Sequence, residues 1–280
     1  MYYDLNVPWT DNQREMQRAI AFLDELGYDV VALTHTLSGK IPSDHTSPIP
    51  ATLPFTVPSR LRILRRCTLL LTDSTTNNKL PDLRSSYDIV AARPTSERTL
   101  QQACQTLDVD IISLDLTQKF ETHFKFPTLG SAIARGVKIE LCYGQGVGTQ
   151  DANRKRLVIG NATQLIRVSR GRGLVFSSDA RSVLALRAPA DVINLASVWG
   201  LGRERGKDGL SKEPRSVVEF ARLKKESYRG VVDVVYGGEK PAVVERQQKG
   251  QKGQSQQQQN KRKGDNLEKG SKKSKVQSAK

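Results

Sequence analysis

The feature that most constrains the fold of this chain is a regular alternation of short apolar runs with segments of helical periodicity. Residues 28–35 read YDVVALTH, a continuous β-branched run typical of a strand that is buried on both faces of a sheet. Seven such strands are predicted, at residues 2–7, 28–35, 67–73, 87–94, 109–116, 137–144 and 173–180. Strands that alternate with helices are typical of a parallel sheet with right-handed crossover connections.

Helical segments lie between and after these strands. Between the first two strands, Met16, Ile20 and Leu23 recur at helical spacing, and Thr10 is the expected N-cap of that helix. The number of strands and the length of the alternating region favour a closed barrel over an open, doubly wound sheet. We therefore predict the α/β class, with a TIM-like barrel of about seven parallel strands. Further helices are predicted over residues 96–107, 152–170, 191–201 and 213–226.

Two segments depart from the barrel pattern. Residues 38–60 hold five prolines and are predicted to form a long insertion loop, because proline removes a backbone donor and fixes φ. From residue 237 the composition turns to Gln, Lys and Gly, which cannot bury enough apolar surface to fold alone. We therefore predict a barrel domain over residues 1–236 and a disordered basic tail over residues 237–280.

The charge of the chain points to a polyanionic partner. The formal net charge is +15, of which residues 239–280 carry +8 and the remaining residues carry +7. Nucleic acid is the leading candidate for the partner, and solubility is the alternative explanation. Short basic clusters at residues 261–263 and 272–275 are typical of nuclear-import signals, of RNA-contacting tails and of plain solvated tails.

The three cysteines indicate a reducing compartment. Cys67, Cys104 and Cys142 are odd in number, form no C-x-x-C pair and sit in apolar stretches. This pattern argues against a disulfide framework or a zinc ribbon, and it favours buried thiols. No apolar run approaches the roughly 20 residues of a membrane span, and the N-terminus lacks a signal-peptide pattern. We expect a soluble protein of the cytosol or the nucleus.

Polar side chains stand at the predicted carboxyl ends of several strands, where barrel enzymes hold their reactive groups. Asp4 and Asn6 end the first strand, His35 ends the second and Asp179 ends the seventh. These ends resemble the motifs of the polymerase and histidinol phosphatase (PHP) family of barrel phosphoesterases. Asp-Leu-Asn-Val-Pro stands for the family's Asp-Leu-His-x-His, Thr-His-Thr for its Thr-Asp-His, and Ser-Asp-Ala-Arg for its Ser-Asp-Ala-His.

The departures from the PHP motifs remove metal ligands. Asn6 is a poor substitute for imidazole, Pro8 offers no side-chain ligand, and Arg181 is a fixed cation that repels a metal. The chain holds three histidines, His35, His45 and His123, too few for the usual cluster. We therefore predict no bound metal and no catalytic residue in this chain. Asp4, Asn6, His35 and Asp179 are interpreted as vestigial metal-site positions: Asp4 and Asn6 brace the barrel mouth by hydrogen bonds, and Asp179 pairs with Arg181.

A second resemblance is more specific. Residues 173–180 read GLVFSSDA and are followed by Leu-Arg-x-Pro and then by Asp-Val-x-Asn-Leu. Together with MYYDLNVP, VVALTH and KIELCY, this series is similar to the barrel-forming protein subunit of ribonuclease P, which eukaryotes share with ribonuclease MRP. The resemblance covers residues 1–236 and excludes the tail.

The second resemblance implies a non-catalytic subunit of a ribonucleoprotein enzyme. In that family the RNA carries out the phosphodiester chemistry with bound magnesium, on precursor tRNA at its 5′ end or on precursor ribosomal RNA. The implied partners are the RNA subunit, the precursor tRNA, a small α/β protein subunit and the other proteins of the particle, with no membrane. The implied location is the nucleus, and within it the nucleolus.

Candidate RNA contacts follow from the basic clusters. Folded RNA is recognised largely through phosphates and 2′-hydroxyls, so clustered Arg and Lys suffice without an aromatic platform. Arg60, Arg62, Arg65 and Arg66 precede the predicted third strand, while Arg154, Lys155 and Arg156 open a helix, where backbone N–H groups also favour phosphate. The other candidates are Arg93, Lys119, Arg170, Arg172, Arg181, Arg203, Arg205 and Lys207, with Arg167 beside them in the same turn as Arg170.

Two other functions stay open from the sequence. One is a metal-dependent PHP-type phosphoesterase with divergent ligands, which would show phosphatase or nuclease turnover with manganese or zinc. The other is an RNA-binding barrel that works outside ribonuclease P, which would co-purify with other RNAs and other proteins.

Overall fold

The computed structural model describes residues 1–39, 46–72, 79–119 and 124–226. The predicted tail, the boundary at residue 237, His45 and His123 lie outside the described residues, and the proline-rich loop is described in part. The division into two domains therefore stays a prediction. Within the described part of the chain, no helix combines the length and the apolar character that a membrane span requires.

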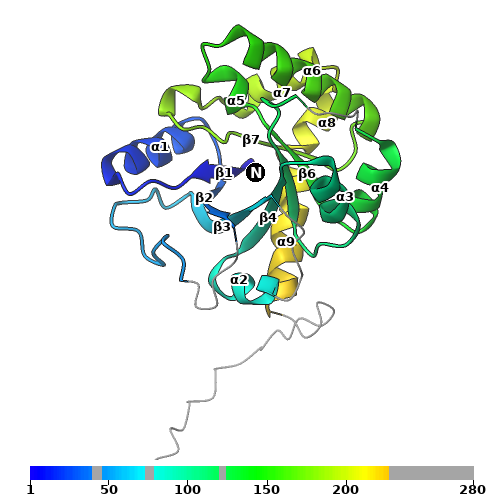
Figure 1. The fold of residues 1–280 in the computed structure, drawn as a ribbon. Helices are drawn as coiled ribbons and strands as arrows, with labels where there is room; N and C mark the ends of the chain where they lie inside the picture. Colours follow the sequence, from blue (N-terminus) through cyan, green and yellow to red (C-terminus); the bar gives the residue numbers. More distant parts are fainter. Residues whose placement is uncertain (40–45, 73–78, 120–123, 227–280) are drawn as a thin grey trace, which may run out of the picture. The chain divides into compact units, whose positions relative to one another are not determined.

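The described residues form a parallel barrel (Figure 1). Each strand pairs in parallel with the next one along the chain, and helices surround the strands. The strands are β1 (Tyr3–Pro8), β2 (Val30–Ser38), β3 (Arg62–Leu71), β4 (Ile89–Pro94), β5 (Ile111–Leu114), β6 (Lys138–Cys142) and β7 (Leu174–Ser177). The helices are α1 (Gln13–Glu25), α2 (Leu80–Ser86), α3 (Glu97–Gln105), α4 (Phe126–Ala134), α5 (Gly144–Val147), α6 (Ala152–Ser169), η2 (Val183–Ala185), α7 (Pro189–Val198), α8 (Arg203–Asp208) and α9 (Lys212–Glu226). The predicted α/β barrel is confirmed.

The seam between β1 and β7 is bridged by a turn and by the hydrogen bond from Asp179 N to Asn6 O at 2.8 Å, rather than by a strand ladder. Within the described residues these two strands share no ladder. The turn between α8 and α9 inserts between them, where Tyr3 N donates to Leu210 O at 3.0 Å and Phe176 N to Gly209 O at 3.0 Å. A Cβ on Gly209 would lie 2.8 Å from the Phe176 ring, so glycine is required for this close approach.

The interior of the barrel has two layers of different chemistry. The lower layer is apolar, and Leu5, Leu64 and Val175 pack there against Val217 and Val218 of α9. Helix α9 therefore caps the amino end of the barrel, with each large buried side chain contributing about 1.5–3 kcal/mol. The upper layer, at the carboxyl ends of the strands, is polar and includes Asn6, Thr34, Arg66, Thr68, Ser113, Glu140, Cys142 and Ser177, all buried.

Strand β3 differs most from its prediction. It begins at Arg62 rather than at residue 67, because Arg62, Arg65 and Arg66 pair in register with Val30, Leu33 and Thr34 of β2. The arginines therefore belong to the strand and do not precede it. Charged residues interrupt the apolar pattern of a buried strand, so this extension of β3 could not be predicted from the sequence.

The predicted N-cap of α1 needs correction, whereas the prediction for the cysteines is confirmed. The N-cap of α1 is Asn12 rather than Thr10, and its side chain accepts a hydrogen bond from Glu15 N at 3.4 Å. The three cysteines are buried and free, as predicted.

Candidate functional site: the barrel mouth and an arginine cleft

The polar layer at the mouth of the barrel is organised around Glu140 of β6. Its side chain is 0% exposed and faces Arg66 of β3, with Arg66 Nη2 2.7 Å from Glu140 Oε2. Ser177 Oγ donates to Glu140 Oε1 at 2.7 Å, and Asn6 Nδ2 donates to Oε2 at 3.2 Å. Burial acts to raise the pKa of Glu140, but the charge of Arg66 and these hydrogen bonds outweigh it and hold the pKa at about 2. Glu140 is therefore ionised and fully compensated.

Arg66 donates its hydrogen bonds to groups inside the protein. Besides Glu140, its guanidinium donates to the carbonyl of Leu5 at 2.7 Å and to Thr68 Oγ1 at 3.1 Å, and the side chain is 0% exposed. RNA cannot reach this group while the barrel is folded. The prediction of Arg66 as an RNA contact is therefore wrong, because the strand places it inside the barrel.

A second ion pair lies at the same mouth. Arg93 Nη2 stands 3.0 Å from Asp179 Oδ2 and also donates to Ser113 Oγ at 3.0 Å. Gln145 Nε2 donates to the same oxygen of Asp179 at 2.9 Å. The predicted pairing of Asp179 with Arg181 is wrong, because Asp179 adopts a positive φ of 47° and meets Arg93 instead.

Asp4 and Asn6 form hydrogen bonds across the seam between β1 and β7. Asp4 Oδ1 accepts from the backbone N–H of Asn6 at 3.2 Å and of Ser178 at 3.0 Å, and Asn6 O accepts from Asp179 N at 2.8 Å. Among the residues that the structure describes, buried Asp4 Oδ2 has no hydrogen-bond partner. Burial raises the pKa of Asp4 to about 6, against the bonds from Ser178 that lower it.

His35 does not join this group. Its Nδ1 lies 2.9 Å from Tyr87 Oη, and the two rings stack with centroids 6.4 Å apart. Tyr87 belongs to the core between the strands and the outer helices, which is also where Leu33 of β2 packs. His35 therefore lies on the outer face of β2, since alternate residues of a strand share a face.

The residues at the mouth do not fit a polynuclear metal site. Within the described residues, no three His, Cys, Asp or Glu side chains are grouped so that they could hold a metal ion. The guanidinium groups of Arg66 and Arg93 already stand beside the carboxylates of Glu140 and Asp179. A divalent cation there would meet two fixed positive charges.

The remaining basic candidates divide by their surroundings. Arg60 is exposed but pairs with Asp24 at 3.0 Å, and Arg65 is half-buried on β3. Arg154 is exposed, with Asp151 at 3.6 Å, so that surface pair is weak. The other exposed candidates are Arg62, Lys119, Lys155, Arg156, Arg170, Arg172, Arg181, Arg203, Arg205 and Lys207.

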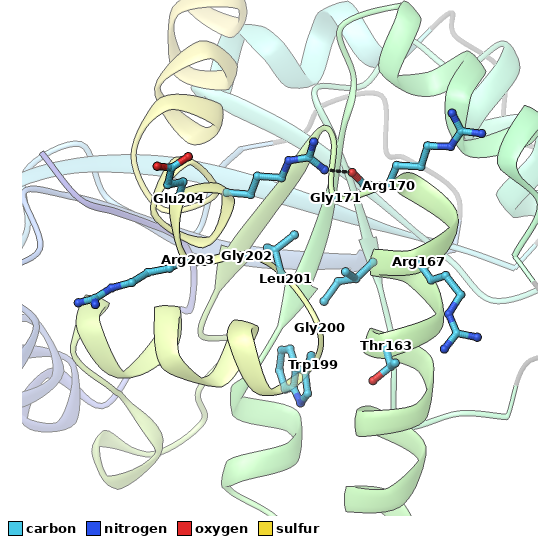
Figure 2. A pocket seen from close by; sticks show the side chains of 12 residues that line it. Thr163, Arg167, Arg170, Gly171, Trp199, Gly200, Leu201, Gly202, Arg203 and Glu204 are labelled. Carbon is cyan, nitrogen blue, oxygen red and sulfur yellow. Dashed lines mark hydrogen bonds between the residues drawn. The ribbon is translucent and has the colours of Figure 1, made fainter.

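Two of the predicted basic clusters meet in one cleft, which we call the arginine cleft. It is lined by Arg167 and Arg170 at the end of α6 and by Arg203 and Arg205 of α8, around a cavity of about 770 Å³ (Figure 2). Arg205 Nη1 donates to the carbonyl of Arg170, which ties the two segments together. Sequence reasoning found both clusters but missed that they are neighbours. Gly171 was the available signal, because a residue without a side chain lets the two segments approach closely.

Comparison with known proteins identifies the family. The family model described as RNase P subunit p30 matches residues 1–226. The chain belongs to the RNase P subunit p30 family. This p30-family chain is 34% identical over 236 residues to the probable ribonuclease P protein subunit 3 of Schizosaccharomyces pombe, covering 83% of this chain and 99% of that protein.

Other members of the p30 family show similar coverage. The chain is 32% identical to mouse ribonuclease P protein subunit p30, over 84% of this chain and 90% of the relative. It is 29% identical to the ribonuclease P/MRP protein subunit RPP1 of Saccharomyces cerevisiae, over 85% of this chain and 86% of that protein. A chain from the cryo-EM structure of archaeal ribonuclease P with mature tRNA superposes with a TM-score of 0.64 at 14% identity, over 85% of this chain and 100% of that one, which shows the shared fold.

Proposed function

We propose that this chain is the barrel-forming protein subunit of ribonuclease P and of ribonuclease MRP, and that it binds RNA and partner proteins without catalysing a reaction. The observation that carries the proposal is the match of the p30 family over residues 1–226, which spans every described element from β1 to α9. The match to this chain extends over 86–99% of the length of three relatives that are named as ribonuclease P or P/MRP subunits.

The barrel mouth supports a non-catalytic role. Two of the carboxylates at the mouth, Glu140 and Asp179, are paired with Arg66 and Arg93, and a third, Asp4, accepts from backbone N–H groups of Asn6 and Ser178. A hydrolytic metal centre needs open ligands and a cavity for water, and the described residues here form closed ion pairs instead. We propose that the RNA component catalyses cleavage with its own magnesium and that this chain holds no metal or cofactor.

The partners and location follow from the same proposal. The substrates of the particle are precursor tRNA, cleaved at the 5′ end, and precursor ribosomal RNA, and a small α/β subunit is among the protein partners. Exposed basic residues such as Lys155, Arg156 and Lys207 suit contact with RNA phosphates. The protein functions in the nucleus, and within it we propose the nucleolus, where the basic clusters of the tail serve import or RNA contact.

Affinity purification of the full chain tests this function. Sequencing the co-purified RNA is expected to recover the ribonuclease P and MRP RNAs, and the eluate is expected to cleave precursor tRNA until the RNA is digested. Recovery of unrelated RNAs without this activity would support an RNA-binding barrel outside ribonuclease P. Turnover by the purified chain with manganese or zinc, lost in Asp179→Asn, would instead support a phosphoesterase.

A further inference from the structure

The arginine cleft is built from two segments that are far apart in the sequence. Arg170 ends α6 in the left-handed conformation, with φ 54°, and Gly171 follows with φ 66°. A Cβ on Gly171 would lie 2.6 Å from Leu201 Cδ1 and 3.1 Å from Arg205 Nη1. The absence of a side chain at Gly171 therefore lets the end of α6 and the start of α8 close against each other.

The floor of the cleft is buried and largely apolar. Trp199, Leu201 and Ile166 line it, and they are only 4%, 3% and 5% exposed. The guanidinium of Arg170 is held in place from outside, because its Cζ lies 5.0 Å from the centroid of the Phe126 ring. Two of the four cations, Arg170 and Arg205, are therefore held before any ligand arrives, which lowers the entropy lost on binding.

The charge of the cleft is not compensated by the protein. Four arginines and one acid, Glu204, line the cleft, and within the described residues none of the four arginines forms an ion pair. By contrast, Arg60, Arg66, Arg84 and Arg93 each pair with an acid. Positive charge that no acid neutralises attracts an anionic ligand.

The arrangement of the cations favours an extended polyanion over a single small anion. Arg203 points to one side of the cleft, whereas Arg167 and Arg170 point to the other, and Glu204 lies away from Arg167 and Arg170 (Figure 2). The groups do not converge on one point. A guanidinium presents paired donors that match phosphate oxygens, so spaced arginines suit successive phosphates of one strand.

We propose that the arginine cleft binds the phosphate backbone of the RNA subunit. The inference rests on the proposed function and assigns one RNA contact to named residues. Arg167, Arg170 and Arg203 contact phosphates, and Arg205 positions the cleft by its bond to the carbonyl of Arg170. Because the contacts are to phosphates, the cleft selects RNA by backbone shape rather than by base sequence.

The test compares two charge-matched double variants of the full chain. Arg167→Gln with Arg203→Gln removes two cations from the cleft. Arg14→Gln with Arg98→Gln removes two exposed arginines from α1 and α3, outside the cleft and outside every predicted cluster. Each tagged chain is purified from cells, and its affinity for a transcript of the RNA that co-purifies with wild type is measured from 0.05 to 0.3 M salt. Circular dichroism melts check that both variants fold.

The expected result is a loss specific to the cleft. Each phosphate contact contributes about 0.7–0.9 to the slope of log affinity against log salt, so the cleft variant is expected to lose about 1.5 from the slope. The control variant is expected to keep the wild-type slope. An unchanged slope in a folded cleft variant overturns the proposal, as does an equal loss in both variants.

Two further outcomes separate the cleft from the proposed function. If the wild-type chain recovers no ribonuclease P or MRP RNA, the proposed function fails and takes the cleft's assignment to the RNA subunit with it. If the cleft variant binds the transcript normally but loses a protein of the particle, the cleft binds an acidic protein surface, and the RNA proposal is overturned while the proposed function stands.

Discussion

Arginines gather at two places in this barrel, and the two groups are held in different ways. At the mouth, Arg66 and Arg93 are enclosed by β-strands and paired with Glu140 and Asp179. In the arginine cleft, Arg167 and Arg203 are exposed and form no ion pair within the described residues. The mouth uses arginine to neutralise buried carboxylates, whereas the cleft leaves positive charge available to a partner. The same residue type therefore supports the fold in one region and a binding surface in the other.

The largest effect is expected from breaking the pair at the mouth. Arg66→Met leaves the carboxylate of Glu140 buried and uncompensated, so we expect the free energy of unfolding to fall by about 3–5 kcal/mol. Urea denaturation at neutral pH measures this fall. The control is Arg66→Met with Glu140→Met, which removes both charges and is expected to recover most of the loss. A single variant as stable as wild type would show that the pair does not organise the mouth.

The next effect is a pH dependence of stability that originates at the mouth. The pKa of Asp4 is about 6 in the folded protein and 3.8 as a free side chain, so the folded state binds this proton more tightly. Its contribution is therefore fully present below about pH 4 and is lost as the pH rises through 6, a change of about 3 kcal/mol. Asp4→Asn keeps an acceptor for Ser178 N and is expected to abolish this component.

The measurement is the difference in unfolding free energy between wild type and Asp4→Asn at several values from pH 4 to pH 7. Glu140 has the opposite sign, because its pKa is lowered to about 2, and its stabilisation is lost only as the pH falls below about 4.5. A difference that stays constant from pH 4 to pH 7 would refute the raised pKa of Asp4.

A smaller effect is expected where the walls of the cleft touch. Gly171→Ala places a Cβ 2.6 Å from Leu201 at a positive φ, whereas Gly136 has a positive φ of 85° but no atom of the described residues within 4 Å of an added Cβ. We expect the Gly136 variant to lose about 1 kcal/mol and the Gly171 variant about 2 kcal/mol. Thermal melts compare the two, and only Gly171→Ala is expected to weaken RNA binding. Equal losses of unfolding free energy in the two variants would mean that Leu201 and Arg205 can move away from the added Cβ without destabilising the protein.

The smallest effect on stability is expected from the arginines of the cleft themselves. Arg203→Gln removes an exposed cation that has no ion pair within the described part of the chain, so the free energy of unfolding of this variant is expected to stay within about 0.5 kcal/mol of wild type. Urea denaturation, as for Arg66→Met, measures this free energy, so the two arginine variants can be compared directly. A loss comparable to that of Arg66→Met would remove the distinction between the two regions.

The comparison also separates what local sequence could predict from what it could not. The alternation of strands and helices was readable, because burial on both faces leaves a continuous apolar run such as residues 28–35. The start of β3 was not readable, since Arg62, Arg65 and Arg66 are charged and their strand pairing depends on β2. Charged residues are normally expected at the surface. Arg154 and Arg156 on α6 are exposed as this rule predicts, whereas Arg66 is buried.

The sequence by itself determined the parallel α/β barrel, the basic charge and the loss of histidine ligands, because periodicity and composition are local properties. Tertiary structure alone decided which arginines are buried and which remain available. Arg66 and Glu140 are 74 residues apart, and Arg170 and Arg205 are 35 residues apart. The closure of the seam by Gly209 and Leu210 was equally a tertiary matter. Charge pairing depends on distances of a few ångströms between such residues, and only the closed barrel sets those distances.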